Sequence, residues 1–249
     1  MRSILGIDIG GSGIKGGIVD VEIGKMISER IRVETPPDGD PIEISRLIHK
    51  MFDDFSWKGP VGVGFPAVIL DGEAITAANI SEDWIGLNVN GLLSKGSDCR
   101  VFTVNDADAA GMAEMNFGAG KNLKHGVVMM ITLGTGIGSA IFIDGTLVPN
   151  TELGHLIIDG KDAEKWTSAY AKERLNLSWK KWSNRLQVYF DYLESLFSPN
   201  LFIVGGGVSK DAEKFIPRLH TRADIIPATF QNQAGIIGAA LFAASKEKN

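Results

Sequence analysis

Apolar residues recur along the chain with two spacings, which separate the expected strands from the expected helices. Short apolar runs bounded by glycine or polar residues predict strands in residues 4–9, 60–66, 100–104, 126–133, 139–145 and 200–207. Apolar positions three and four residues apart predict helices in residues 41–55, 105–117, 178–197 and 234–245. Because strands and helices alternate, the pattern is typical of an α/β protein.

Two of the expected helices carry a clear apolar face. In residues 41–55 this face consists of Ile44, Leu47, Ile48, Met51, Phe52 and Phe55, after a proline that suits the first helical position. In residues 178–197, the longest expected helix, it consists of Trp179, Trp182, Leu186, Phe190, Leu193 and Phe197. Both segments are therefore predicted to be amphipathic helices.

The segment LGIDIGGSGIKGGIVD, residues 5–20, contains glycines spaced as in the dinucleotide-binding fingerprint. Gly11, Gly13 and Gly16 form G-x-G-x-x-G, which binds pyrophosphate where a strand leads through the glycines into a helix. Here Gly17 and a series of β-branched residues follow, and these favour a strand over a helix. The segment therefore predicts a strand, a glycine turn and a second strand, without a dinucleotide site.

A second segment repeats this arrangement in the middle of the chain. MITLGTGIGSAIFIDG, residues 130–145, again has an apolar strand, a Gly-Thr-Gly turn and another strand that ends near an aspartate. Such turns leave backbone N–H groups that can hold phosphate oxygens, although glycine is also common in ordinary hairpins. The matched pair favours phosphate binding at Gly10, Gly11, Ser12, Gly13, Gly134, Thr135 and Gly136, joined by Lys15 unless that lysine is simply solvated.

Asp8 stands in the strand just before the first turn. A carboxylate beside a phosphate loop repels phosphate unless Mg²⁺ lies between them. Asp8 therefore predicts a metal–phosphate site, with a turn-capping role as the alternative.

Polar residues at two other places are candidates for chemistry. Asn105 and Asp106 stand where a strand meets a helix, a position that faces the ligand crevice in open α/β sheets. Asp106 can accept a proton from a substrate hydroxyl there, but Asn and Asp are also favoured helix N-caps, and both roles stay open.

Glu152, His155 and Glu164 lie in a predicted loop where they can bind vicinal sugar hydroxyls, with a structural role as the alternative for His155.

Composition narrows the possible classes of protein. A net charge of −5 over 249 residues argues against general nucleic-acid binding, which needs a basic surface. The only cysteine, Cys99, excludes an intramolecular disulfide and a multi-cysteine zinc site, and favours a reducing, cytoplasmic setting. The apolar run at residues 4–9 is too short for a signal peptide, and no run is long enough to span a membrane.

Basic residues gather between residues 161 and 185 of this acidic chain. They are Lys161, Lys165, Lys172, Arg174, Lys180, Lys181 and Arg185. Lys180 and Lys181 open the longest expected helix, whose apolar face begins at Trp179 and Trp182, so both lysines point away from the core. Either they are solvated, or they hold a flexible polyanion through charge contacts that salt weakens.

Four motifs span nearly the whole chain: LGIDIGGSGIKGG, TLGTGIGSA, FIVGGGVSK and NQAGIIGAALFA. In this order they resemble the two phosphate motifs, the nucleotide-side glycine motif and the closing helix of the ROK sugar kinases, a family of the actin–hexokinase superfamily. The third motif adds Gly206 to the expected phosphate contacts. Members of the family that use inorganic polyphosphate are similar in further stretches, NDADAAGMAEMNFGAGK, LVPNTELGHL, DGKDAEK, LSWKKW and LFSPNLFIVGGGVSK.

The resemblance implies the superfamily's fold, with two ribonuclease H-like α/β lobes and an active-site cleft between them. The small lobe is expected at residues 1–104, completed by a C-terminal helix at 234–249, and the large lobe at 105–233. A homodimer is also implied. Some relatives are sugar-sensing regulators with an N-terminal DNA-binding module, but this chain begins directly on its first strand, so an enzyme is expected.

The reaction implied by the resemblance moves the terminal phosphoryl group of inorganic polyphosphate, and in some members of ATP, to O6 of glucose. Mg²⁺ would bridge the phosphate oxygens near Asp8, and a strictly ATP-dependent hexose kinase is the alternative. Carried over by position, Asp106 is the catalytic base, and the sugar contacts are Asn79, Asn105, Glu152, His155 and Glu164, the last of which begins an E-x-x-x-S pattern closed by Ser168. Many members have a C-x-C-G-x-x-G-C zinc motif before that glutamate, where this chain has LIIDGKDAEK, so no zinc is expected.

Overall fold

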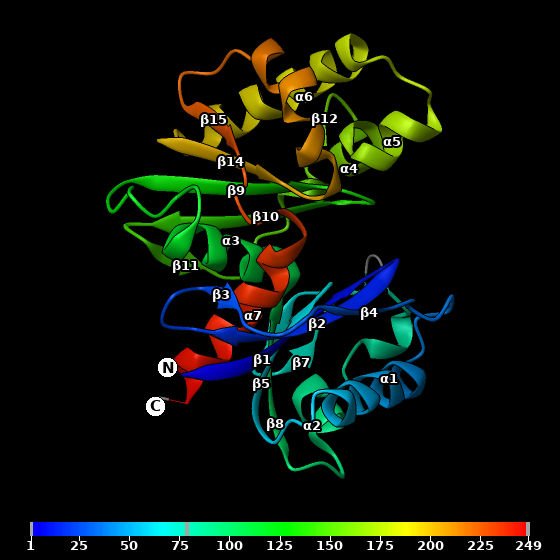
Figure 1. The fold of residues 1–249 in the computed structure, drawn as a ribbon. Coiled ribbons are helices and arrows are strands. Elements are labelled where there is room, and N and C mark those ends of the chain that lie inside the picture. Colours follow the sequence, from blue (N-terminus) through cyan, green and yellow to red (C-terminus); the bar gives the residue numbers. More distant parts are fainter. Residues whose placement is uncertain (1, 78–79, 248–249) are drawn as a thin grey trace. The chain divides into compact units, whose positions relative to one another are not determined.

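The computed structural model describes residues 2–77 and 80–247, which form two compact units (Figure 1). Unit 1 is formed from Met1–Ala113 and Gln233–Asn249, and unit 2 from Glu114–Asn232. The chain therefore leaves unit 1 once, forms unit 2, and returns to complete unit 1 with its last helix.

Unit 1 is built on a six-stranded sheet. Its strands are β1 (Ser3–Gly10), β2 (Gly13–Asp20), β3 (Lys25–Met26), β4 (Ile31–Val33), β5 (Gly59–Phe65) and β8 (Cys99–Asn105), in the order β3-β2-β1-β5-β8 with β4 also paired to β2. β1 and β2 form an antiparallel hairpin, whereas β1, β5 and β8 run parallel. The other elements are α1 (Pro41–Asp54), β6 (Ile69–Leu70), β7 (Glu73–Ala74), the 3₁₀ turn η1 (Glu82–Trp84), α2 (Val89–Ser94), the start of α3 (Asp106–Phe117) and α7 (Ala234–Lys246).

One face of this sheet packs against α1. Leu5 and Ile7 alternate along β1 and are buried in the same apolar cluster as Ile48 of α1. Asp40 begins the helix, because its carboxylate accepts the Glu43 N–H at 2.8 Å and so satisfies one of the first unpaired donors. The predicted apolar face of residues 41–55 is thus the face that meets the sheet.

The opposite face of the sheet is covered by α7, whose small residues allow a very close contact. A Cβ built on Gly62 of β5 would overlap with the carbonyl oxygen of Ala239, so the two backbones touch directly. Figure 1 shows α7, in red, on the side of this sheet away from α1 and α2. The helix therefore belongs to unit 1, as the expected completion of the first lobe requires.

α3 begins where β8 ends, and its first turns also belong to unit 1. Val104, Ala109 and Ala239 share one buried cluster, which joins the start of α3 to α7. The boundary between the units accordingly falls inside α3, after Ala113, whereas the sequence suggested a boundary after residue 104.

Unit 2 repeats the strand order of unit 1. Its sheet contains β9 (Val127–Leu133), β10 (Ile137–Ile143), β11 (Thr146–Val148), β14 (Leu201–Gly205) and β15 (Asp224–Pro227), in the order β11-β10-β9-β14-β15. Again an antiparallel hairpin is followed by a strand parallel to its first member. The other elements are η2 (Leu153–His155), β12 (Ile157–Ile158), β13 (Lys161–Asp162), α4 (Ala163–Thr167), α5 (Ala169–Arg174), α6 (Trp179–Phe197), η3 (Gly207–Lys214), η4 (Ile216–Arg218) and η5 (Gln231–Gln233). The two glycine-turn segments resemble each other because each forms the hairpin of a sheet with the same strand arrangement.

α6 covers one face of the unit 2 sheet with the apolar side that the sequence predicts. Trp182, Leu186 and Phe190 are fully buried, and the Phe190 ring meets Phe202 of β14 edge-on at 5.0 Å between centroids. Ser178 caps the helix by accepting the Lys181 N–H at 3.3 Å. This packing anchors the start of α6, where the basic residues gather.

Each strand and helix predicted from the apolar pattern is present, with bounds that differ by only a few residues. The pattern did not find the two short hairpins β6–β7 and β12–β13, because strands of two residues carry no period. Among the described helices, none combines the length and the apolar composition needed to cross a membrane.

Candidate active site

The first glycine turn joins β1 to β2 at the edge of the unit 1 sheet where its parallel strands end. Gly10 pairs with Gly13, so only two residues form the turn. Two side chains from outside the hairpin hold it, since Thr35 Oγ1 donates to the Gly10 carbonyl at 2.5 Å and the Arg32 guanidinium donates to the Ser12 carbonyl at 3.0 Å. Arg32 thus adds a positive charge beside a turn that is expected to meet phosphate.

Asp8 and Lys15 face each other across the hairpin just before the turn. Asp8 Oδ2 and Lys15 Nζ are 3.0 Å apart, and both side chains remain partly exposed. A Cβ built on Gly64 would lie 3.8 Å from Asp8 Oδ1 and 3.6 Å from the Asp106 Cα, so the two aspartates flank the same glycine. The parallel strands β1, β5 and β8 therefore bring Asp8 and Asp106 to one edge of the sheet.

Asp8, at this edge of the sheet, is suited to a Mg²⁺ ion that is bound together with phosphate. Within residues 2–77 and 80–247, no three or more His, Cys, Asp or Glu side chains are placed to hold a metal ion together. Mg²⁺, however, usually keeps several waters and is bound through one or two carboxylates plus substrate phosphates. The single, partly exposed Asp8 beside a glycine turn fits an ion that arrives with phosphate, and does not form a closed protein site.

Asn105 takes one of the two roles that the sequence left open, that of the helix N-cap, and Asp106 stands beside it at the start of α3. Asn105 is 5% exposed, and its Oδ1 accepts the N–H groups of Ala107 at 2.9 Å and Asp108 at 3.1 Å. Its Nδ2 donates to the Ala67 carbonyl at 3.1 Å, so Asn105 is a firmly held N-cap of α3. The Asp106 carboxylate is less buried, accepts the Ala107 N–H at 2.8 Å, and stands at the helix N-terminus, where a negative charge is stabilised.

The second glycine turn, Gly134–Gly136, occupies the corresponding edge of the unit 2 sheet. The Gly134 N–H donates to the Gly136 carbonyl at 2.9 Å, and Thr135 is exposed between them. Gly206 follows β14 beside this turn with φ +80°, and a Cβ on it would overlap with the backbone of Leu133. The turn and the loop at Gly206 therefore lie side by side.

The loop Glu152–His155 is fastened to β10 just after the second turn. Ser139 Oγ donates to the Thr151 carbonyl at 2.6 Å and accepts the Leu153 N–H at 3.0 Å. Thr151 Oγ1 donates back to the Ser139 carbonyl at 2.9 Å. Gly154 lies so close to the β10 backbone that any side chain there would overlap with it. The predicted sugar-binding loop is thus held on β10 at Thr151, Leu153 and Gly154.

Three predicted sugar contacts lie near one another in unit 2. Glu164 Oε2 accepts the Ile137 N–H at 2.8 Å, which ties α4 to the residue directly after the glycine turn. His155 Nδ1 is 3.5 Å from Asp162 Oδ2. Burial raises the pKa of Glu152, His155 partly offsets this, and the neighbouring Glu164 carboxylate adds to the rise. Glu152 and His155 of the loop therefore lie in one small region with Glu164, which the structure places in α4 and not in the predicted loop.

The predicted site residues fall into two groups, one in each unit. Unit 1 holds Asp8, Gly10, Gly11, Ser12, Gly13, Lys15, Asn105 and Asp106, and unit 2 holds Gly134, Thr135, Gly136, Glu152, His155, Glu164 and Gly206. Ser168 caps α5 by accepting the Ala171 N–H at 3.1 Å. Lys180 and Lys181 are exposed in the first turn of α6. Asn79 lies outside the described residues.

Four residues that hold these groups in place were not predicted: Arg32, Thr35, Ser139 and Thr151. The short strand β4 has no period of its own, and only its pairing with β2, Arg32 opposite Lys15, brings Arg32 to the first turn. A hydroxyl at Ser139, inside an otherwise apolar strand, was the one available signal, because buried polar groups are nearly always hydrogen-bonded.

Both the sequence and the fold of this chain are similar to those of known proteins. The sequence model of the ROK family matches residues 4–170. Polyphosphate glucokinase of Mycobacterium tuberculosis is 45% identical over 241 residues, which are 96% of this chain and 91% of that protein. The crystal structure of inorganic polyphosphate/ATP-glucomannokinase from Arthrobacter sp. strain KM is 48% identical, with a TM-score of 0.95 over 99% of this chain and 100% of that chain. A ROK family glucokinase from Streptomyces griseus, solved in complex with glucose and AMPPNP, is 26% identical with a TM-score of 0.82 over 98% of this chain and 100% of that chain. These similarities extend over both units and do not rest on a single motif.

Proposed function

The chain belongs to the ROK family and has the actin/hexokinase-like fold of its sugar kinases, and on that premise we propose that it phosphorylates glucose at O6 with inorganic polyphosphate as donor. ATP is a second donor in this proposal, and the product is glucose 6-phosphate. The similarity to polyphosphate-using relatives along nearly the whole chain is the observation that carries the proposal.

Asp106 is the proposed general base. Because Asn105 already caps α3, the helix does not depend on Asp106 for its N-cap. A carboxylate in hydrogen-bond reach of O6 would accept the hydroxyl proton as the phosphoryl group arrives. Phosphoryl transfer depends mainly on positioning and charge neutralisation, so a base fixed at a strand–helix junction suits the reaction.

Glu152, His155 and Glu164 are the proposed sugar contacts of unit 2. Carboxylates accept hydrogen bonds from neighbouring hydroxyls, and an imidazole can donate or accept one. Asn105, and Asn79 outside the described residues, complete the proposed set. Because the Glu152–His155 loop is fastened through Ser139, its side chains would be held in place before glucose binds.

The two glycine turns are the proposed contacts of the phosphate donor. Their backbone N–H groups, with Ser12, Thr135 and Lys15, would hold phosphate oxygens. Asp8 is the residue proposed to hold Mg²⁺, which when bound would neutralise the charge that develops on those oxygens. No residue set for zinc is proposed.

A strictly ATP-dependent hexose kinase is the second candidate, supported by the likeness to the Streptomyces griseus glucokinase. A homodimer in the cytoplasm completes the proposal, and the lone Cys99 supports a reducing setting.

The decisive experiment supplies purified protein with glucose, Mg²⁺ and either ATP-free polyphosphate or polyphosphate-free ATP. Formation of glucose 6-phosphate with polyphosphate alone is expected. Product with ATP but none with polyphosphate would replace the proposal by the second candidate, and no product with either donor would contradict both.

A further inference from the structure

Three lysines are carried by two elements whose backbones are both connected to the second glycine turn, and we propose that these lysines hold the part of a polyphosphate chain that extends beyond the reacting terminal groups. The lysine cluster consists of Lys172 of α5 and of Lys210 and Lys214 of η3. This inference rests on the proposed function, because it assigns a binding place to the donor of that reaction.

The first connection between the turn and the cluster runs through α5. The Tyr170 N–H donates to the Gly134 carbonyl at 3.1 Å, so the start of α5 is bonded directly to the turn. Ser168 fixes this helix end as its N-cap. Lys172 lies two residues beyond Tyr170 on the same short helix, and its position is therefore tied to that of the turn.

The second connection runs through the loop after β14. Gly206 packs against the backbone of Leu133, the last residue before the turn. η3 begins at the next residue and carries Lys210 and Lys214, and Ser209 secures its start by donating to the Gly206 carbonyl at 2.8 Å. The two elements that carry the lysines are thus both anchored, at their starts, next to the glycine turn.

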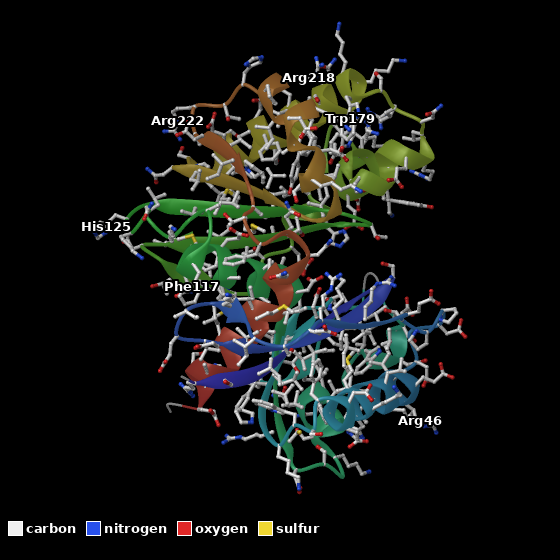
Figure 2. The ribbon with its side chains drawn as sticks, viewed as in Figure 1. Arg46, Phe117, His125, Trp179, Arg218 and Arg222 are labelled. Atoms are coloured by element: carbon white, nitrogen blue, oxygen red, sulfur yellow. The ribbon has the colours of Figure 1, made fainter. Side chains whose placement is uncertain are left out.

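The Trp179 ring is contacted by lysines of both α5 and η3. Lys172 Nζ lies 4.1 Å and Lys214 Nζ 5.5 Å from its centroid. Trp179 in turn stacks on Phe215, with the ring planes 9° apart and the centroids 6.1 Å apart. Figure 2 labels Trp179 at the start of α6, in the upper part of the view. The ammonium groups are therefore positioned by a fixed aromatic surface.

The charged groups around the Trp179 ring favour the binding of an anion. Asp211 accepts a hydrogen bond from Lys214 Nζ at 2.6 Å, which is the main reason that its pKa is lowered, and Lys210 and Lys172 lower it further. Asp211 is the main cause of the raised pKa of Lys214, and the charge of Glu213 raises this pKa further. Among the groups that interact around Asp211 and Lys214, three are lysines and two are acids, so positive charge is in excess there in a chain whose net charge is −5.

A ligand with repeated negative charges suits this arrangement better than a nucleoside. The cations come from two elements and are spread over a surface, so a flexible polyanion can contact several at once. Trp179 is already contacted by Phe215 and by two ammonium groups, which does not favour stacking of an adenine ring. The adenosine of ATP has no negative charge to offer, whereas polyphosphate continues beyond its terminal groups.

The test compares a Lys172→Ala, Lys210→Ala double variant with the parent and with a Lys121→Ala, Lys124→Ala control. The control removes the same charge from exposed lysines of unit 2 that lie outside the cluster. The KM is measured for long-chain polyphosphate, for tripolyphosphate and for ATP, and long-chain polyphosphate is also titrated calorimetrically without glucose. Lys214 is left in place because it holds Asp211.

The cluster variant is expected to raise KM and Kd for long-chain polyphosphate about five-fold, the equivalent of losing two charge contacts near the surface. Its KM for ATP, tripolyphosphate and glucose should stay close to those of the parent and the control. Added NaCl should raise KM for long-chain polyphosphate more in the parent than in the variant. Equal effects on all donors, or the same effect in the control, would overturn the inference while the proposed function stands. A parent that gives no glucose 6-phosphate with polyphosphate, yet binds it through these lysines, would instead contradict the proposed function alone.

Discussion

Replacing Ser139 with alanine tests whether the proposed sugar-binding loop depends on its attachment to β10. Ser139 is 1% exposed, and its hydroxyl donates to the Thr151 carbonyl and accepts the Leu153 N–H. The substitution removes both hydrogen bonds and the 3.1 Å contact of the hydroxyl with Thr151 Oγ1, but keeps the Cβ. It therefore leaves a carbonyl and an N–H of the loop without their partner, and no new group fills the space.

The expected loss of stability follows from those two groups. A buried polar group that loses its partner costs about 1–3 kcal/mol, and an ordinary hydrogen bond contributes about 1 kcal/mol. Ser139→Ala should therefore lower the free energy of unfolding by about 2 kcal/mol. The remaining bond from Thr151 Oγ1 to the Ser139 carbonyl limits the damage, so the loop should loosen but stay attached. KM for glucose should rise several-fold, with little change in KM for the phosphate donor.

Ser183→Ala is the matched control. Ser183 is also buried in unit 2, at 2% exposure, but among the described residues its hydroxyl has no hydrogen-bond partner. Burying an unpaired hydroxyl is unfavourable, so this variant should be as stable as the parent or slightly more stable. Urea unfolding followed by tryptophan fluorescence and glucose-dependent kinetics would be measured on both variants. The reasoning is refuted if the two variants lose equal stability, or if Ser139→Ala leaves both stability and KM for glucose unchanged.

Three further predictions concern the proposed chemistry. Asp106→Asn should keep glucose binding, measured by calorimetry, but lose roughly 10²–10⁴-fold in kcat, the usual contribution of a general base; near-normal turnover would leave Asp106 as a structural residue only. Burial raises the pKa of Glu152, so from about pH 4.5 upward the folded state binds more protons than the unfolded state, and stability falls as pH rises through the folded pKa. Glu152→Gln should therefore gain stability relative to the parent between about pH 4.5 and pH 7 while weakening glucose binding by about 1–3 kcal/mol, and parallel stability curves for the two proteins would contradict this. Lys180→Ala with Lys181→Ala should raise KM for long polyphosphate several-fold, about 1 kcal/mol, with KM for ATP unchanged, and an equal effect on both donors would reduce these lysines to solvated surface.

The sequence alone determined the type and order of the main elements. Gly16 and Gly17, followed by β-branched residues, excluded a helix after the first glycine turn, and β2 is indeed a strand paired with β1. The apolar spacing of residues 41–55 and 178–197 predicted α1 and α6, because one buried face of a helix leaves a period that is visible in the sequence. The likeness of the two glycine-turn segments likewise predicted two strand–turn–strand units, and both are present as the hairpins β1–β2 and β9–β10.

Tertiary structure decided which of two neighbouring polar residues caps α3. Asn105 and Asp106 are both good N-caps by residue type, so the sequence could not separate cap from base. The position of Ala67, whose carbonyl accepts from Asn105, is what fixes Asn105 as the cap. The division between the units depends in the same way on a distant contact, since α7 must return to bury Ala109 before the start of α3 can belong to unit 1.

The surroundings of the glycine turns also depended on contacts that are far apart in the sequence. Arg32 reaches the first turn because β4 pairs with β2, and the lysine cluster forms because β9 and β14 run parallel and end at the same edge. A local pattern reports which face of an element is buried, since that depends on its own period. It does not report which elements become neighbours, because that is set by the packing of whole sheets and helices, and so the residues that surround the turns became known only from the folded structure.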